Sequence, residues 1–277
     1  MCLTLSIVVI LLSVMGSPTL RHEEKFTTQL AFKPGNHLEV STSNGNIEVT
    51  TWDKDSLAVE ATKFVETHTE TDATELIREI KIDIKQLDTG ICISTQLPRT
   101  NYTIGVNYKL TLPKQANLKL RSYNGNIVIH NVDGITTAKT FNGEVKVYDL
   151  KNKVDIDTHN GGITAHHIEG DAKLTTHNGE LNLTGIFTNL HAETDNGNIS
   201  CDITQWQASA DITLETHNGN ITANLPHVTG IAIYAESYNG KVKSDFPIYT
   251  KPEQLPHTNV MLKLVTHNGS VNIIKTQ

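Results

Sequence analysis

The dipeptide Asn-Gly recurs along this chain at a fixed interval, and that repeat constrains the fold more than any other feature. It occurs nine times, and the five copies from Asn124 to Asn196 are each 18 residues apart. A short constant period is typical of a solenoid, in which each repeat buries its apolar edge only against neighbouring repeats. The expected corners of the regular array are Asn124 and Gly125, Asn142 and Gly143, Asn160 and Gly161, Asn178 and Gly179, Asn196 and Gly197, and Asn218 and Gly219.

Apolar residues occupy fixed positions around each corner. We call each repeat a rung and name it after its corner asparagine. In the Asn178 rung, Leu174, Leu181 and Leu183 alternate with polar residues, which predicts strand, turn and strand. The position four before the asparagine and the position three after it are apolar in all later rungs, which predicts a continuous dry core. These two columns are Leu120, Ala138, Ile156, Leu174, Ala192, Leu214, Ala235 and Leu264, and Ile127, Val145, Ile163, Leu181, Ile199, Ile221, Val242 and Val271.

The chemistry of the corner leaves two architectures open. Glycine after asparagine permits a positive φ at the corner, and asparagine can itself bond neighbouring backbone groups. Identical units at one period favour a mainly β fold, namely a right-handed parallel β-solenoid or β-helix with rungs of about 18 residues. Asn-Gly is also the strongest two-residue hairpin signal, so an antiparallel β meander is the alternative.

The first third of the chain is less regular than the rest. It holds one outlying rung at Asn44, several strand-like runs, and a capping-box pattern of Asp72 and Glu75 that predicts a helix beginning at Asp72. We therefore expect an N-terminal α+β cap over residues 17–112 and a β-solenoid over residues 113–277. Such a cap would shield the open strand edge of the solenoid.

The spacing of the corners loosens toward the C-terminus, where the last insertion contains three prolines. This composition predicts a loop that covers or flanks the final rungs. The prolines are Pro247, Pro252 and Pro256.

The N-terminus resembles a secretory leader. Residues 3–15 are almost wholly apolar and small residues follow, so residues 1–16 are predicted to be a signal peptide cleaved before Ser17. The leader lacks an initial Lys or Arg, which leaves an uncleaved signal anchor as the alternative and the only expected membrane contact. The protein is expected to be exported to the periplasm, the cell envelope or the medium. Beyond the leader only Cys92 and Cys201 remain, too few for a disulfide framework.

Charge and motifs exclude several classes of function. The formal net charge is -7 and the basic residues are scattered, so nucleic acid, which requires a basic surface, is not an expected partner. The sequence contains no nucleophile elbow, phosphate loop, dinucleotide fingerprint, His-Glu-x-x-His or Cys-x-x-Cys. We expect no enzymatic activity and no cofactor, with a β-helix carbohydrate-active enzyme as the least favoured alternative.

Three features carry a family likeness: the repeated S/T-x-Asn-Gly-x-Ile unit, the passage from Lys109 to Gly134, and the short early helix. The chain resembles the bacterial putative-adhesin family of domains with Asn-Gly β-strand repeats, a family of unknown function. The likeness covers residues 38–274. It implies a β-solenoid fold and an envelope or surface location, with an adhesin-like binding or structural role toward a protein or glycan partner.

The residue before each late asparagine is expected to point outward, which makes this column the candidate binding site. Rungs stack about 5 Å apart, so neighbouring rings in the column can stack or share a cation. The functional hypotheses are a glycan strip or a cation site, for which His159, His177, Asp195 and His217 are weak ligand candidates. The alternative is a ladder whose rings stack for stability. The column reads Tyr123, Phe141, His159, His177, Asp195, His217, Tyr238 and His267.

Overall fold

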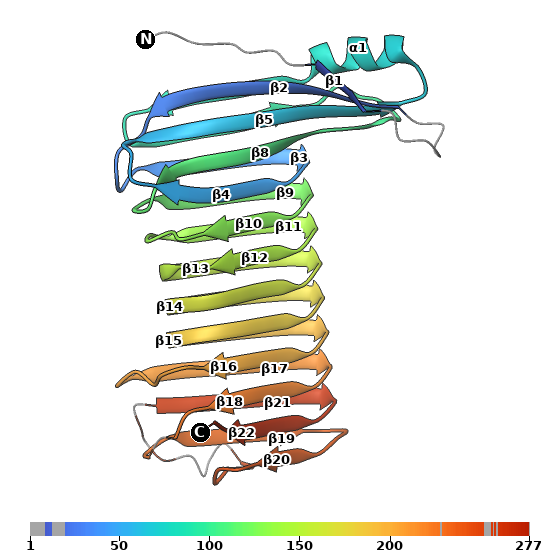
Figure 1. Ribbon diagram of the computed structural model, residues 1–277. Helices are drawn as coiled ribbons and strands as arrows, with labels where there is room; N and C mark the ends of the chain where they lie inside the picture. The colour runs from blue at the N-terminus through green and yellow to red at the C-terminus, as the bar shows by residue number, and fades with distance from the viewer. Residues whose placement is uncertain are drawn as a thin grey trace. The chain divides into compact units, whose positions relative to one another are not determined.

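The computed structural model describes residues 9–12, 20–227, 229–251, 256, 258 and 260–276 (Figure 1). The chain divides into two compact units, which we call unit 1 (up to Gly134) and unit 2 (from Ile135 onward). Strands dominate both units, and the described residues contain a single helix. The mainly β fold expected from the sequence is confirmed.

Unit 2 is a stack of parallel strands. Every strand pair recorded in it is parallel, and successive early rungs are offset by 18 residues, so that Asn142 pairs with Asn160 and Asn160 with Asn178. The parallel solenoid is therefore confirmed, and the antiparallel meander is wrong for these rungs. The strands are β11 Thr136–Asn142, β12 Val145–Tyr148, β13 Lys151–Asn160, β14 Ile163–Asn178, β15 Leu181–Asn196, β16 Ile199–Ile203, β17 Ala210–Asn218, β18 Ile221–Leu225, β19 Ala232–Ser237, β20 Val242–Ser244, β21 Val260–Asn268 and β22 Val271–Lys275.

The last rungs of unit 2 do not stack in chain order. β17 and β18 pair with β21 and β22, the final strands of the chain, which in turn pair with β19 and β20. The Asn268 rung is thus inserted between the Asn218 and Asn239 rungs, as the red strands of Figure 1 show. Tyr249, in the insertion, donates from its backbone N to Ile233 O at 2.8 Å and so covers part of the outer edge of β19. A flanking loop was expected there; Pro252 lies outside the described residues.

The two apolar columns predicted from the sequence form the core. All of their members are buried except Val242, which is half-buried because β20, among the described residues of unit 2, pairs with β22 alone. Cys201 lies fully buried in the same core, and its burial raises the pKa of its thiol. Cys92 is a free thiol as well, so the sulfur atoms contribute packing and not cross-links.

The corner glycines are required by close packing between rungs. A Cβ on Gly179 would lie 2.1 Å from the carbonyl oxygen of Gly161, and one on Gly161 would lie 2.0 Å from that of Gly143. Neither glycine adopts a left-handed φ. The positive φ expected at the corners is therefore wrong for these rungs, and the actual constraint is the absence of space for any side chain.

Two side-chain ladders fix each corner of unit 2. The corner asparagines form a continuous amide ladder, in which Asn178 donates through Nδ2 to Asn160 Oδ1 at 2.9 Å and accepts from Asn196 Nδ2 at 2.9 Å. Two residues before each corner, a Thr or Ser hydroxyl donates to the corner-glycine carbonyl of the adjacent rung. The donors are Thr158, Thr176, Thr194, Thr216, Thr266 and Ser237. The repeated Thr-x-Asn-Gly thus encodes contacts between rungs.

Unit 1 combines two rungs with an antiparallel sheet. Parallel pairing joins β7, β3 and β9, and also β8, β4 and β10, whereas β8, β5, β2 and β1 are antiparallel, as are β6 and β7. The strands are β1 Val9–Leu12, β2 Leu20–Ala31, β3 His37–Asn44, β4 Ile47–Trp52, β5 Ser56–Thr67, β6 Lys81–Leu87, β7 Gly90–Gln96, β8 Thr103–Pro113, β9 Asn117–Asn124 and β10 Ile127–His130.

The Asn44 rung is not an outlier in space. Asn44 pairs directly with Asn124, and Asn124 Nδ2 donates to Asn44 Oδ1 at 2.6 Å. The intervening strands fold out and return, so the expectation of a separate early rung is wrong. Asn44 Nδ2 ends the ladder on the carbonyl of Ile104 at 3.0 Å.

The helix α1 spans Glu70–Glu79 and packs against β2 and β5. Its N-cap is Thr69, whose hydroxyl accepts a hydrogen bond from the backbone N of Asp72 at 3.2 Å. The prediction that the helix begins at Asp72 is therefore wrong: Asp72 lies inside the first turn, and the stronger N-cap residue precedes it.

The predicted leader falls mostly outside the described residues. Of residues 1–16, only Val9–Leu12 are described, as β1, which pairs with β2. Among the residues that the structure describes, no helix is long and apolar enough to cross a membrane.

Candidate functional site

The candidate site is the set of side chains that directly precede the corner asparagines of unit 2. Each lies at the end of a strand, or directly after it in the case of Tyr238, between an inward Thr or Ser and the corner asparagine, so alternation along the strand directs it outward. We call this set the ring column. In spatial order it consists of Phe141, His159, His177, Asp195, His217, His267 and Tyr238. Tyr123, the eighth predicted residue, lies at the end of β9 in unit 1 and is 54% exposed.

The rings of the first half of the column stack face to face. The centroids of Phe141 and His159 are 4.6 Å apart with planes inclined by 14°, and those of His159 and His177 are 4.7 Å apart with planes inclined by 6°. His177 Nδ1 then meets a carboxylate oxygen of Asp195. The stack is therefore continued by a polar contact at the only position that lacks a ring.

The second half of the column depends on the altered order of the rungs. His267 lies between His217 and Tyr238, with centroid separations of 4.6 Å to each ring. The sequence order predicts that Tyr238 neighbours His217, and this is wrong because β21 is inserted between β17 and β19. All of the predicted unit 2 positions are brought together in one column, but in a different order.

Stacking determines which part of each ring meets the solvent. Because the ring faces lie against each other, His159 and His177 present mainly their edges, which carry N–H and C–H groups. A sugar strip in which each ring face contacts one sugar would need those same faces. Tyr238 ends the column and is 61% exposed, so an open ring face is found at the end of the stack and not along it.

Acidic side chains border the ring column but are already paired. Lys139 contacts Asp157 at 3.1 Å, Lys263 contacts Glu215 at 2.5 Å, and His191 contacts Glu193 at 3.2 Å. Within the described parts of the chain, no three His, Cys, Asp or Glu side chains converge as a metal ion would require. The histidine and acidic columns therefore form pairwise contacts instead of a coordination sphere.

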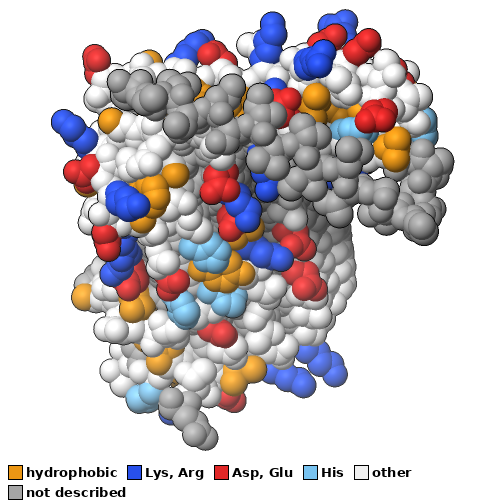
Figure 2. All heavy atoms as spheres, turned by 45° about the horizontal axis from the view of Figure 1, so that its top comes forward, with side chains coloured by type: hydrophobic (Ala, Val, Ile, Leu, Met, Phe, Trp, Pro, Cys, Tyr) orange, Lys and Arg blue, Asp and Glu red, His pale blue; other side chains and the backbone are white. Residues whose placement is uncertain are grey.

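Two shallow hollows lie between the ring column and the acidic residues. One, of about 250 Å³, is lined by residues that include His159, His177 and Glu193. The other, of about 170 Å³, includes Glu215, His217 and His267. Figure 2 shows histidines gathered around hydrophobic side chains on one face, with acidic side chains beside them. The surface combines ring edges with carboxylates.

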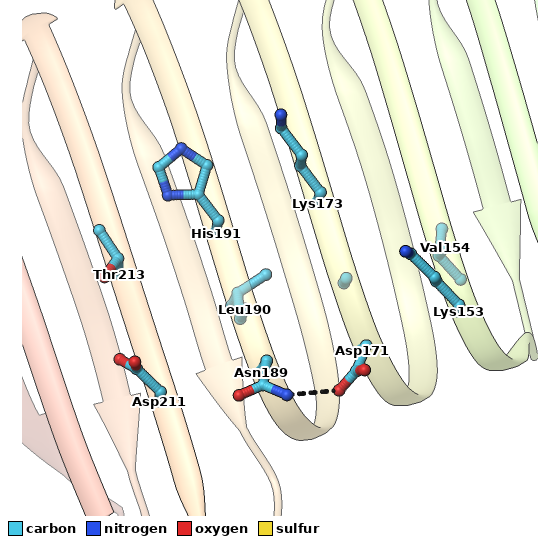
Figure 3. A pocket seen from close by; sticks show the side chains of 10 residues that line it. Lys153, Val154, Asp171, Lys173, Asn189, Leu190, His191, Asp211 and Thr213 are labelled. Carbon is cyan, nitrogen blue, oxygen red and sulfur yellow. Dashed lines mark hydrogen bonds between the residues drawn. The ribbon is translucent and has the colours of Figure 1, made fainter.

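A further groove lies elsewhere on unit 2 and was not predicted from the sequence (Figure 3). It measures about 370 Å³ and crosses the starts of the rungs, with Lys153 and Lys173 on its rim. Asn189 Nδ2 donates to Asp171 Oδ1 at 2.8 Å across it. Its lining mixes both charges without a buried polar group aimed into it, so we assign it no ligand. In the sequence, the only signal for this groove is that charged residues recur at one position of successive rungs.

A family model described as Toastrack DUF4097 matches residues 35–274. The chain belongs to the Toastrack DUF4097 family. The match includes both Asn-Gly rungs of unit 1 and every rung of unit 2, which agrees with the resemblance identified from the repeat. No curated protein gives a significant match to this Toastrack chain.

One solved structure supports the fold of this Toastrack protein. A putative adhesin from Bacteroides fragilis is 13% identical, with 90% of this chain and 97% of that chain covered and a TM-score of 0.51. A putative adhesin from Parabacteroides merdae (12% identity, 90% and 96% covered, TM-score 0.43) and a putative lipid binding protein from Parabacteroides distasonis (14%, 91% and 97%, 0.36) are more distant in shape. At these identities the likeness concerns the fold alone.

Proposed function

We propose that this Toastrack protein is an exported, non-catalytic surface protein that binds a protein or glycan partner along the ring column of unit 2. The observation that carries the proposal is the column itself: an exposed row of stacked rings, interrupted at Asp195, along the parallel strands of unit 2. Phe141 and Tyr238 are 39% and 61% exposed. Rings at an exposed edge contribute contact area that a purely structural ladder does not need.

Pre-organisation supports a binding role. Stacking and the contact between His177 and Asp195 hold these side chains in one arrangement, so a partner would meet a surface that is already ordered. The conformational entropy normally lost at an interface is then small. Ring edges can donate through N–H groups, whereas carboxylates accept, so together they suit a partner that offers both acceptors and donors, such as hydroxyl groups, along an extended surface.

The binding test compares two quadruple variants on adjacent faces. Replacing His159, His177, His217 and His267 by Ala should reduce binding of the labelled protein to intact cells of the producing organism at least tenfold. The matched control replaces four outward residues on the neighbouring strands, Thr164, Asn182, Ser200 and Thr222, and should bind as the parent does. Equal binding by both variants would exclude the ring column as the contact surface.

Export and the lack of catalysis are tested separately. N-terminal sequencing of the protein recovered from the cell envelope or medium should begin at Ser17, whereas a cytosolic protein that begins at Met1 would contradict export. Incubation with a panel of polysaccharides should release no new reducing ends. Any turnover that a point variant of the ring column abolishes would contradict the non-catalytic role.

A further inference from the structure

Unit 1 contains a pocket of about 500 Å³ beside the corner of the Asn44 rung. Its lining comes from that corner, from the start of β2, and from β8 and the segment that leads into it, including Arg21, Asn46, Asn101, Tyr102 and Asn107. Its volume falls within the range of about 300 to 1,000 Å³ that is usual for small-ligand sites. Neither the Asn-Gly period nor the ring column indicates this pocket.

Two asparagine amides in the pocket have fixed orientations. The backbone N of Asn46 donates to Asn107 Oδ1 at 2.8 Å, and the backbone N of Asn126 donates to Asn46 Oδ1 at 2.8 Å. Because a backbone N–H can only donate, the oxygen of each amide is identified and its Nδ2 points elsewhere. Neither Nδ2 has a partner among the residues that the structure describes, so two oriented donors remain available.

The charge of Arg21 is already balanced. Its Nε donates to Glu23 at 2.9 Å and its Nη1 to Glu66 at 2.7 Å, while its guanidinium carbon lies 4.5 Å from the centroid of the Phe64 ring. Partial burial lowers the pKa of Arg21, but the two carboxylates together outweigh it and raise that pKa above its ordinary value. With two carboxylates on one guanidinium, the pocket does not favour an anion such as phosphate.

An aromatic wall completes the pocket. The hydroxyl of Tyr102 donates to Asp72 Oδ2 at 3.1 Å, which fixes a half-buried ring, and His68 meets that ring edge-on at 6.1 Å. Apart from these contacts no ring stacks on Tyr102 in the described chain, unlike the rings of the ring column. Tyr102 thus lines the pocket beside several amide groups, a combination that suits a sugar, since a sugar has an apolar face and hydroxyl groups at its rim.

We propose that this pocket binds a single neutral sugar residue. The amide donors of Asn46 and Asn107 bond its hydroxyl or acetamido oxygens, Asn101 offers both a donor and an acceptor, and the face of Tyr102 packs against the sugar ring. The site is separate from the ring column, so it does not rest on the function proposed above. It adds contact with the face of a sugar ring, which the stacked rings of the column, with their own faces occupied, do not supply.

The test uses nuclear magnetic resonance of ¹⁵N-labelled protein with methyl glycosides of glucose, galactose and N-acetylglucosamine as probes, and inorganic phosphate as the anionic comparison. At millimolar concentration, at least one glycoside should shift the side-chain NH₂ signals of Asn46 and Asn107. No shift with any glycoside, or shifts with phosphate alone, would overturn the proposal. An oligosaccharide that ends in the active sugar shows whether the pocket binds the end of a glycan chain. If it does, the oligosaccharide should shift the same side-chain NH₂ signals as the glycoside, and if the pocket accepts only the free sugar, it should not.

Isosteric variants separate binding from folding. Asn46→Asp and Asn107→Asp keep the oxygen that accepts the backbone hydrogen bond but remove the Nδ2 donors, so each should weaken glycoside binding at least tenfold. The control is Asn220→Asp in unit 2, where Asn220 Oδ1 accepts from Ser270 N at 2.8 Å in the same corner position. Full binding by both pocket variants would refute the assignment. The quadruple histidine variant of the ring column should retain glycoside binding in the unit 1 pocket. The two proposals are therefore tested independently, and either can fail without the other.

Discussion

The hydroxyl of Thr176 donates a hydrogen bond of 2.8 Å to the carbonyl oxygen of Gly161, on the adjacent rung. Thr176 is only 2% exposed, so its hydroxyl is shielded from solvent. The same contact recurs at five other rungs of unit 2, and it satisfies a carbonyl that the close approach of the corner glycines would otherwise leave unpaired. Rung stacking thus depends on a polar contact at the edge of the core as well as on apolar packing.

Thr176→Val should destabilise the protein by about 1 to 3 kcal/mol, because it removes a buried donor and leaves the half-buried Gly161 carbonyl without its partner. Urea unfolding followed by circular dichroism measures the change. Thr176→Ser is the matched control, since it keeps the hydroxyl and loses only a methyl group. A valine variant as stable as the serine variant would show that the hydrogen bond contributes nothing.

Gly179→Ala should be more damaging, by more than about 3 kcal/mol, because its Cβ would lie 2.1 Å from the backbone oxygen of Gly161 and the rungs would have to separate. Thermal unfolding and hydrogen exchange across both rungs measure the effect. Gly162→Ala is the control, because its nearest neighbour is Glu180 O at 3.1 Å. Similar losses at the two sites would indicate that the space between corner glycines is not the constraint.

The sequence predicts the rung but not the order of the rungs. The apolar columns and the Asn-Gly period determine what one rung looks like, and nearly all of the predicted inward residues are buried. Every rung has the same pattern of inward apolar positions, so nothing local specifies which neighbour it stacks on. For this reason the pairing of Asn44 with Asn124 and the insertion of the Asn268 rung were missed. The same is true of the candidate site. Its outward positions can be predicted from the alternation along each strand, but the neighbours of each ring depend on the order of the rungs, which the sequence does not specify.

The free energy of unfolding should depend on alkaline pH through the buried phenol of Tyr108. Burial raises its pKa to about 12, against a weaker lowering effect of the hydrogen bond with Thr95 at 2.6 Å. Below pH 10 the phenol is protonated in both the folded and the unfolded chain and adds no pH dependence. Between about pH 10 and 12 the unfolded chain loses this proton first, so stability should fall by up to about 3 kcal/mol.

The measurement for Tyr108 is the difference in unfolding free energy between parent and Tyr108→Phe, followed from pH 8 to pH 12. Other tyrosines and the lysines titrate in both proteins, so their contribution cancels in the difference. The phenylalanine variant should lose less stability than the parent above pH 10. Parallel curves would mean that Tyr108 ionises equally easily in the folded chain.

Because the last rungs do not stack in chain order, removing β21 and β22 should affect a strand that precedes them in the sequence. In a solenoid stacked in chain order, removing the final strands leaves the preceding rung in place. Here β21 lies between β17 and β19, and Ala235 pairs with Leu264. A chain that ends at Thr250 should therefore lose the amide protection of β19, although β19 itself is intact, while β13 to β15 stay protected. Hydrogen exchange with mass spectrometry reports each strand separately. As a control, Lys275→Ala at the exposed end of β22 should leave β19 protected, and persistent protection of β19 in the truncated chain would mean that it stacks on β17 instead.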